Sequence, residues 1–230
     1  MSIKENFVIP GRFKTISLGL MAVGVLAIIG LYITTHGGGG TAEEKAMHDA
    51  RFWASLLQNS VYFLLVVNAS MFFICATTLA WGGWQMAFRR VPEAISAVVP
   101  VIGVIALAIL LAITYGDNHT IYHWTDAAHV EHDRILKFKA GFLNKTFFTV
   151  MTLFTVIGWS VLGWKMRQLS RSLDENPLPS IEAGKSYIWK NTVWAALYIV
   201  VFALTIMSSI PWLWLMSIDA HWYSTMYSWY

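Results

Sequence analysis

Five long apolar stretches constrain the fold of this 230-residue chain more than any motif does. They are residues 15–35, 52–84, 94–115, 146–164 and 192–216. A helix needs about 20 residues to cross the roughly 30 Å hydrocarbon core of a bilayer. The composition, with 57% hydrophobic and 13% charged residues, also differs from that of soluble domains. The sequence therefore predicts an all-α integral membrane protein, a multi-span helical bundle with five transmembrane helices in a single domain covering residues 1–230.

Lysine and arginine are distributed unevenly between the segments that separate these stretches. If the N-terminus lies inside, ten basic residues fall on the inner side and six on the outer side. The pair Arg89 and Arg90 lies in a short connection, where the preference of basic residues for the cytoplasmic side is strongest. We therefore expect a multi-pass protein of an inner membrane with a cytoplasmic N-terminus. Residues 123–145 would lie outside, and residues 168–187 would form a long cytoplasmic loop.

The positions of polar residues disfavour several classes of membrane protein. All seven histidines lie outside the cores of the five stretches, which argues against haem b held between transmembrane helices. No Lys, Arg, Asp or Glu lies deep in a stretch, which argues against voltage sensors and proton pumps with a buried carboxylate. The single cysteine, Cys75, excludes an intrachain disulfide and a cysteine-ligated iron–sulfur cluster of the chain's own. Polar groups within the second stretch are expected to face other helices or internal water, namely Gln58, Asn59, Asn68 and Ser70.

Residues 117–146 form a polar stretch between two apolar ones and hold four of the seven histidines. On a single helix, Tyr122, Asp126, His129 and Asp133 would fall at i, i+4, i+7 and i+11 and so share one stripe. The sequence thus predicts a titratable face at the edge of the membrane.

This face has three interpretations. In the first it is a metal site, because His119 and His123 are spaced H-x3-H and His129 and His132 are spaced H-x2-H. No standard ligand motif is present, so no metal is assigned. In the second it is a solvated amphipathic helix on the outer surface, with its aromatic side chains in the interface and its charges in water.

In the third interpretation the face binds a quinone headgroup. An imidazole would bond a quinone oxygen and a carboxylate would take the proton released on oxidation. The candidates are His123 or His129 for the first role, Asp126 or Asp133 for the second, and Tyr122 and Trp124 on either side of the ring.

Several short runs, taken together, are similar to those of one known family. They are residues 79–84 (LAWGGW), 89–93 (RRVPE), 122–124 (YHW), His132 and Asp133 with Leu136 and Lys139, 142–144 (FLN), Phe147 and Phe148, and 215–225 (LMSIDAHWYST). From about Gln58 onward the chain resembles the second quinone-binding-type membrane protein of alternative complex III, a bacterial quinol:cytochrome c oxidoreductase. That family is related to the NrfD and polysulfide-reductase membrane subunits.

The resemblance implies a subunit with no redox centre of its own in a bacterial respiratory complex. The expected partners are a sister NrfD-like subunit, an iron–sulfur subunit, haem c subunits and lipids, but no nucleic acid. Quinone or quinol is the expected ligand, while the haem c groups and iron–sulfur clusters would reside in the partners. Family members carry more spans, and the last residues of this chain, HWYSTMYSWY, are typical of the start of a further helix.

Asp219 and His221 follow the fifth stretch and are expected at the same outer surface as Asp126, His129 and Asp133. A carboxylate beside a neutral imidazole can receive and pass protons near neutral pH. The alternative is that Asp219 caps the next helix while His221 packs at the interface.

The functional alternatives to a respiratory subunit are a stand-alone transporter and a membrane anchor of another NrfD-type reductase. A transporter would be expected to show broken helices or a charge near the midplane of the bilayer.

Overall fold

The computed structural model describes residues 9–37, 41–116, 119–175 and 180–222, and all of its regular elements are helical. Five helices are long and apolar enough to cross a membrane: Gly11–Thr35, Ala42–Leu79, Arg90–Tyr115, Lys145–Asp174 and Ile181–Asp219. This confirms the predicted all-α membrane architecture. The expected further helix at the C-terminus lies in residues 223–230, outside the described part of the chain.

The chain forms two compact units, Met1–Phe52 and Trp53–Tyr230, and the boundary falls inside the second helix. The first unit contains α1 (Gly11–Gly37) and the start of α2 (Ala42–Leu79). Thr41 and Glu44 form a capping box there: Glu44 N–H donates to Thr41 Oγ1 at 3.3 Å, and Thr41 N–H donates to Glu44 Oε2 at 3.0 Å. The cap explains why α2 begins ten residues before the predicted apolar stretch.

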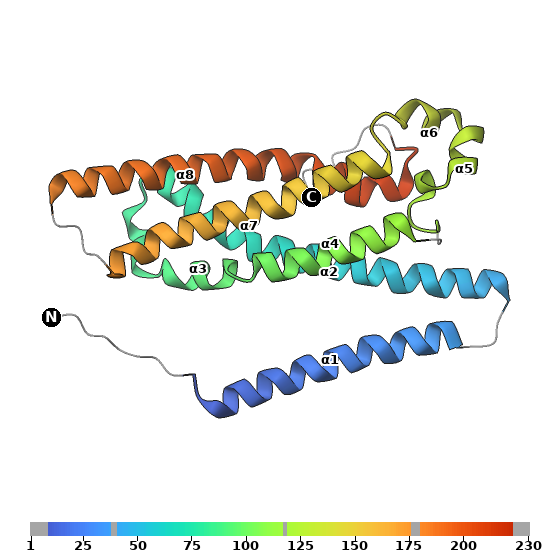
Figure 1. Ribbon diagram of the computed structural model, residues 1–230, viewed down its shortest axis with the longest axis horizontal. Coiled ribbons are helices and arrows are strands. Elements are labelled where there is room, and N and C mark those ends of the chain that lie inside the picture. The colour runs from blue at the N-terminus through green and yellow to red at the C-terminus, as the bar shows by residue number, and fades with distance from the viewer. Residues whose placement is uncertain (1–8, 38–40, 117–118, 176–179, 223–230) are drawn as a thin grey trace. The chain divides into compact units, whose positions relative to one another are not determined.

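The second unit contains the rest of α2, η1 (Gly83–Ala87), α3 (Arg90–Ser96), α4 (Val99–Tyr115), η2 (His123–Thr125), α5 (Ala127–His132), α6 (Arg134–Lys139), α7 (Lys145–Glu175), α8 (Ile181–Met207), η3 (Ser209–Leu215) and η4 (Met216–Asp219). Helix α7 packs against both α4 and α8, and the long helices of this unit run side by side (Figure 1). Helix α2 joins α8 through Tyr198, whose hydroxyl donates to Asn68 Oδ1. At one end of the unit, α5 and α6 lie beyond the end of α4 and the start of α7.

Asn68 is fully buried against α8, as expected for an amide within a span. Gln58 and Asn59 differ from the prediction, because both are exposed. Asn59 instead satisfies its own amide by donating to Ser55 O, one turn earlier, at 2.8 Å. Intrahelical bonding of this kind removes the need for a partner on another helix.

Helix α2 ends at Leu79, not at residue 84. Trp81 adopts a left-handed conformation with φ of 55°. The following N–H of Gly82 donates back to Thr77 O at 2.9 Å, as in a Schellman turn. The left-handed residue reverses the chain, and the short η1 and α3 follow.

Residues 168–187, predicted to be a loop, are mostly helical in their described part, so an irregular loop was the wrong expectation there. Helix α7 continues to Glu175, and α8 begins at Ile181 with Ser180 Oγ accepting from Ala183 N–H at 3.2 Å. Hydropathy detects the part of a helix that crosses lipid and overlooks its polar extension.

Helix α8 gives way to a π-helical turn, η3, after Met207, within the fifth predicted stretch. Pro211 lacks an N–H and its ring would collide with the carbonyl of Met207 in a regular α-helix. Widening the turn accommodates the proline.

Candidate functional site

The polar stretch after α4 does not form one helix, so the predicted stripe of Tyr122, Asp126, His129 and Asp133 was wrong. The described part of the stretch divides into η2, α5 and α6. Asp126 and Asp133 lie at the two breaks, each with an extended backbone. A carboxylate that bonds the N–H groups just ahead of it starts a new helix rather than continuing the old one.

The two aspartates are the N-caps of α5 and α6. Asp126 Oδ1 accepts from Ala128 N–H at 3.0 Å. Asp133 Oδ1 accepts from Ile135 N–H at 2.8 Å and from Leu136 N–H at 3.3 Å. The second oxygen of Asp133 remains available for another partner.

Tyr122 is fully buried and does not line a ligand site. Its hydroxyl donates to Trp214 O at 2.8 Å, and its ring lies 5.5 Å from those of Trp124 and Phe148. Burial raises the pKa of Tyr122 well above its usual value, although a hydrogen bond with Ser217 lowers it in part. The phenol therefore ties the polar stretch to η3, and both Tyr122 and Trp124, the predicted flanks of a quinone ring, are buried in the described structure.

The structure joins Asp133 to His221, 88 residues later: His221 Nε2 lies 2.5 Å from Asp133 Oδ2. Asp219 lies on the other side of the ring, with its Oδ1 3.9 Å from His221 Nδ1 and accepting from His221 N–H at 3.3 Å. Two carboxylates thus flank one imidazole whose side chain is 52% exposed. This confirms that Asp219 and His221 lie at the same surface as Asp133.

Opposing effects act on the pKa of Asp133. Desolvation raises it, but the hydrogen bond with His221, the N–H groups of Ile135 and Leu136, and the charge of His221 together leave the pKa below its ordinary value. Asp133 is therefore the ionised partner of the pair.

The remaining histidines are grouped differently from the predicted metal spacings. His119 Nδ1 lies 2.7 Å from Thr125 Oγ1, while the rings of His123 and His129 lie 5.7 Å apart. Among the described residues, no group of three or more His, Cys, Asp or Glu side chains is placed to hold a metal ion.

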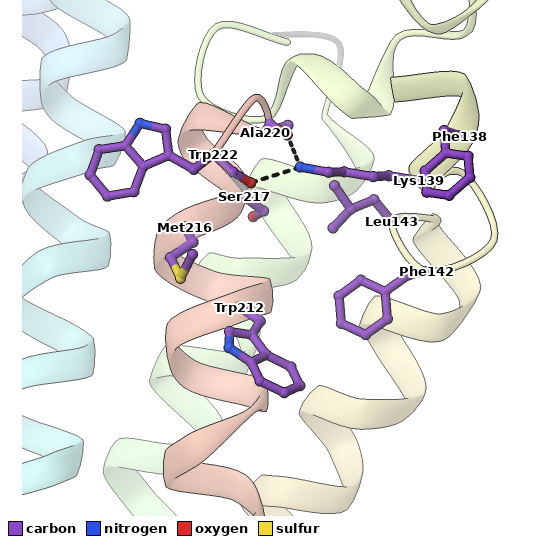
Figure 2. Close-up of a pocket in the computed structure, with 9 residues that line it drawn as sticks. All are labelled: Phe138, Lys139, Phe142, Leu143, Trp212, Met216, Ser217, Ala220 and Trp222. Carbon is purple, nitrogen blue, oxygen red and sulfur yellow. Dashed lines mark hydrogen bonds between the residues drawn. The ribbon is translucent and has the colours of Figure 1, made fainter. Parts of the chain in front are cut away.

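A pocket of about 360 Å³ is lined by Ala220 and Trp222, the two neighbours of His221 in the sequence (Figure 2). Its lining residues are Phe138, Lys139, Phe142, Leu143, Trp212, Met216, Ser217, Ala220 and Trp222. Lys139 reaches across it, and its Nζ donates to Ala220 O at 2.5 Å and to Trp222 O at 2.8 Å. His221 is the residue between those two carbonyls, so Lys139 fixes the turn that carries the imidazole.

The sequence predicted none of the residues that line this pocket as a site. Phe138, Phe142 and Trp212 come from segments about 70 residues apart, and only the fold brings them together.

A buried ionic cluster at the opposite end of the same unit also went unpredicted as a site. Glu93 is 3% exposed and accepts from Arg89 Nε and from Arg90 Nη1, both at 2.8 Å. Arg89 also donates to Asn191 Oδ1 at 3.2 Å. Arg90 also reaches the α7 residues Ser170 and Asp174. The spacing of Arg89, Arg90 and Glu93 at i, i+1 and i+4 is the pattern that could have revealed it.

Comparison with models of protein families finds no match to this chain, and comparison with curated proteins finds none either.

Proposed function

We propose that this chain is a membrane subunit of a bacterial respiratory quinol:electron-acceptor oxidoreductase complex, packed beside the quinol-oxidising subunit. In this proposal the N-terminus is cytoplasmic, and the end of the bundle with α5 and α6 faces outward. The sister NrfD-like, iron–sulfur and haem c subunits carry the electrons.

The pairing of Asp133 with His221, together with the aromatic pocket, is the observation that supports a role for this outward end. The pocket is within the size range of ligand sites, roughly 300–1,000 Å³. Its aromatic side chains suit a planar headgroup, and two of its lining residues, Ala220 and Trp222, are the sequence neighbours of the half-exposed His221. Oxidation of a quinol to a quinone releases two electrons and two protons.

In this function His221 takes one proton from a quinol hydroxyl, releases it to water and then takes the second, while the two electrons leave for the partner subunits. Asp133 stabilises the imidazolium that forms, and exposure of the ring to water lets the proton depart. Asp219 holds the backbone N–H of His221 and orients the ring. His123, His129 and Asp126 lie on the same outward face without a direct bond to this pair among the contacts of the described residues.

The complex is tested by affinity purification of the tagged chain in mild detergent. We expect the iron–sulfur and haem c subunits to co-purify, with the haem identified by its absorption spectrum. A chain that purifies without them favours the stand-alone transporter, for which the interruption of α8 at Pro211 is the supporting observation.

The role of the pair is tested by quinol turnover in the assembled complex. His221→Gln is expected to slow turnover at least about tenfold, because a positioned general base typically contributes more than that. Asp219→Asn should keep assembly intact and slow turnover less. Asp126→Asn, which changes a cap away from His221, serves as the control. Wild-type turnover in an assembled His221→Gln complex would contradict the proton role and leave the subunit assignment standing.

A further inference from the structure

We propose that the C-terminal part of α7 binds an anionic phospholipid, with the phosphate held by Arg167 and Arg171 and an acyl chain lying along the helix. This site is at the opposite end of the unit from the Asp133–His221 pair and does not depend on the proposed function.

The headgroup site is an open pocket of about 480 Å³ lined by Trp164, Arg167, Gln168, Arg171 and Ser172. All five residues come from α7, and the lining offers two guanidinium groups, an amide and a hydroxyl. Guanidinium groups bind phosphate oxygens through paired hydrogen bonds. The lining contains no carboxylate to oppose an anion.

The charge of these two arginines is not compensated within the described part of the chain. Neither Arg167 nor Arg171 forms an ion pair there, in contrast to Arg89 and Arg90. Asp174, one turn from Arg171, is bound by Arg90 instead. An uncompensated pair of arginines beside a bilayer favours an anionic ligand.

The apolar part of the site is a stripe on one face of α7. The exposed apolar residues of the helix recur at alternating spacings of four and three, which places them on one side. They are Val150, Phe154, Ile157, Val161 and Trp164. Gln168 and Arg171 continue the same spacing and are also exposed, so the apolar stripe leads directly into the pocket.

The depth along the helix also fits a lipid. Helix α7 has 31 residues and is about 46 Å long, so it extends beyond a hydrocarbon core of roughly 30 Å. Trp164 is 61% exposed, as is common at the boundary with the headgroups. Arg171 lies about 10 Å further along the helix, and its long side chain can reach back to the phosphate level.

Native mass spectrometry of the full chain, equilibrated in mild detergent with phosphatidylglycerol and phosphatidylcholine, tests the proposal. The wild type should retain phosphatidylglycerol in preference to phosphatidylcholine. In Arg167→Gln/Arg171→Gln the affinity for phosphatidylglycerol should fall about thirty-fold, the loss expected for two arginines near an anionic surface. The matched control is Lys185→Gln/Lys190→Gln, which removes two exposed charges of α8 outside the pocket and should retain the lipid.

Three results would overturn the proposal: no preference for phosphatidylglycerol in the wild type, unchanged binding in the arginine variant, or an equal loss in the lysine control. Excess inorganic phosphate is added to the wild type in a separate arm. Displacement of the lipid by phosphate would identify a free anion as the ligand and also refute the lipid site. If the double variant does not fold, Arg171→Gln alone, at an exposed position, should weaken binding about fivefold.

Discussion

Trp159 of α7 donates its indole N–H to Thr205 Oγ1 of α8 at 2.9 Å, in the fully buried contact between the two helices. Trp214 repeats the arrangement by donating to Thr152 Oγ1 at 3.0 Å. These two large aromatic side chains thus fill the bundle while the indole N–H of each keeps a hydroxyl acceptor. A buried donor without an acceptor would be costly in a lipid environment.

Replacement of Thr205 by valine should lower the free energy of unfolding by about 1–2 kcal/mol, because the shape is kept and the acceptor for Trp159 is lost. SDS-induced unfolding in mixed micelles measures the change. Thr192→Val is the matched control, since that hydroxyl bonds only Ile188 O of its own helix. Equal stability of the two variants would show that the indole bond contributes nothing.

Trp81 offers a test of backbone strain, because its φ of 55° is unfavourable for any residue with a side chain. Trp81→Gly should be more stable than Trp81→Ala by about 1 kcal/mol, the reverse of the usual order within helices. Both variants lose the same exposed indole, so their difference isolates the conformation. Thermal unfolding in detergent measures it, and a more stable alanine variant would contradict the left-handed turn.

Glu93→Gln should destabilise the protein by about 3–5 kcal/mol, because Arg89 would remain buried without its counter-charge. Asp174→Asn removes a carboxylate from the same cluster at a side chain that is 64% exposed. For Asp174→Asn the free energy of unfolding should fall by at most about 1 kcal/mol. SDS unfolding of the two variants compares them, and similar losses would show that burial of Glu93 is unimportant.

The Asp133–His221 pair predicts a specific pH dependence. The pKa of Asp133 is lower in the folded protein than in the unfolded chain. Its ionised form therefore contributes stability above the ordinary aspartate pKa of about 4, and that contribution disappears as the pH falls through the folded value.

Unfolding of wild type and Asp133→Asn between pH 6 and pH 3 measures this contribution. Asparagine keeps the helix cap, so the variant should be less stable at pH 6, and the difference should shrink as the pH approaches 3. Asp126→Asn is the control for a cap that does not contact His221. A difference that stays constant with pH would exclude ionisation of Asp133 as its source.

The proposed orientation is tested by cysteine labelling in intact cells. Glu131→Cys and Lys185→Cys change exposed residues at the two ends of the bundle and preserve both helix caps. A membrane-impermeant maleimide should label the first and not the second, while the native Cys75 is buried. Labelling of Lys185→Cys alone would invert the topology.

The sequence was informative about the spans, because crossing lipid requires long apolar runs whatever the partners are. It was much less informative about the polar connections. Asp126 and Asp133 have the spacing of a helix face, yet each bonds its own backbone and starts a new helix. Bonds from a side chain to its own backbone compete with continuation of the helix. The spacing of the residues alone does not reveal which of the two structures forms.

Contacts between distant segments limited how much of the site could be predicted from the sequence. The sequence identified Asp133, Asp219 and His221 as candidates but not that Asp133 would bond His221. The sequence also did not distinguish Tyr122, which is buried and bonded to Trp214, from residues at the surface. Both outcomes depend on how η3 and the turn after it pack against the polar stretch.

The cluster around Glu93 implies an order of events during biosynthesis. Arg89 and Arg90 enter the membrane region with the first half of the chain, but Ser170, Asp174 and Asn191, which complete their bonding, are translated about 80 to 100 residues later. Until α7 and α8 arrive, the connection between α2 and α4 must keep its arginines in water or among headgroups. The early helices therefore insert before this cluster is complete, and its bonds to Ser170, Asp174 and Asn191 form only after α7 and α8 have been made.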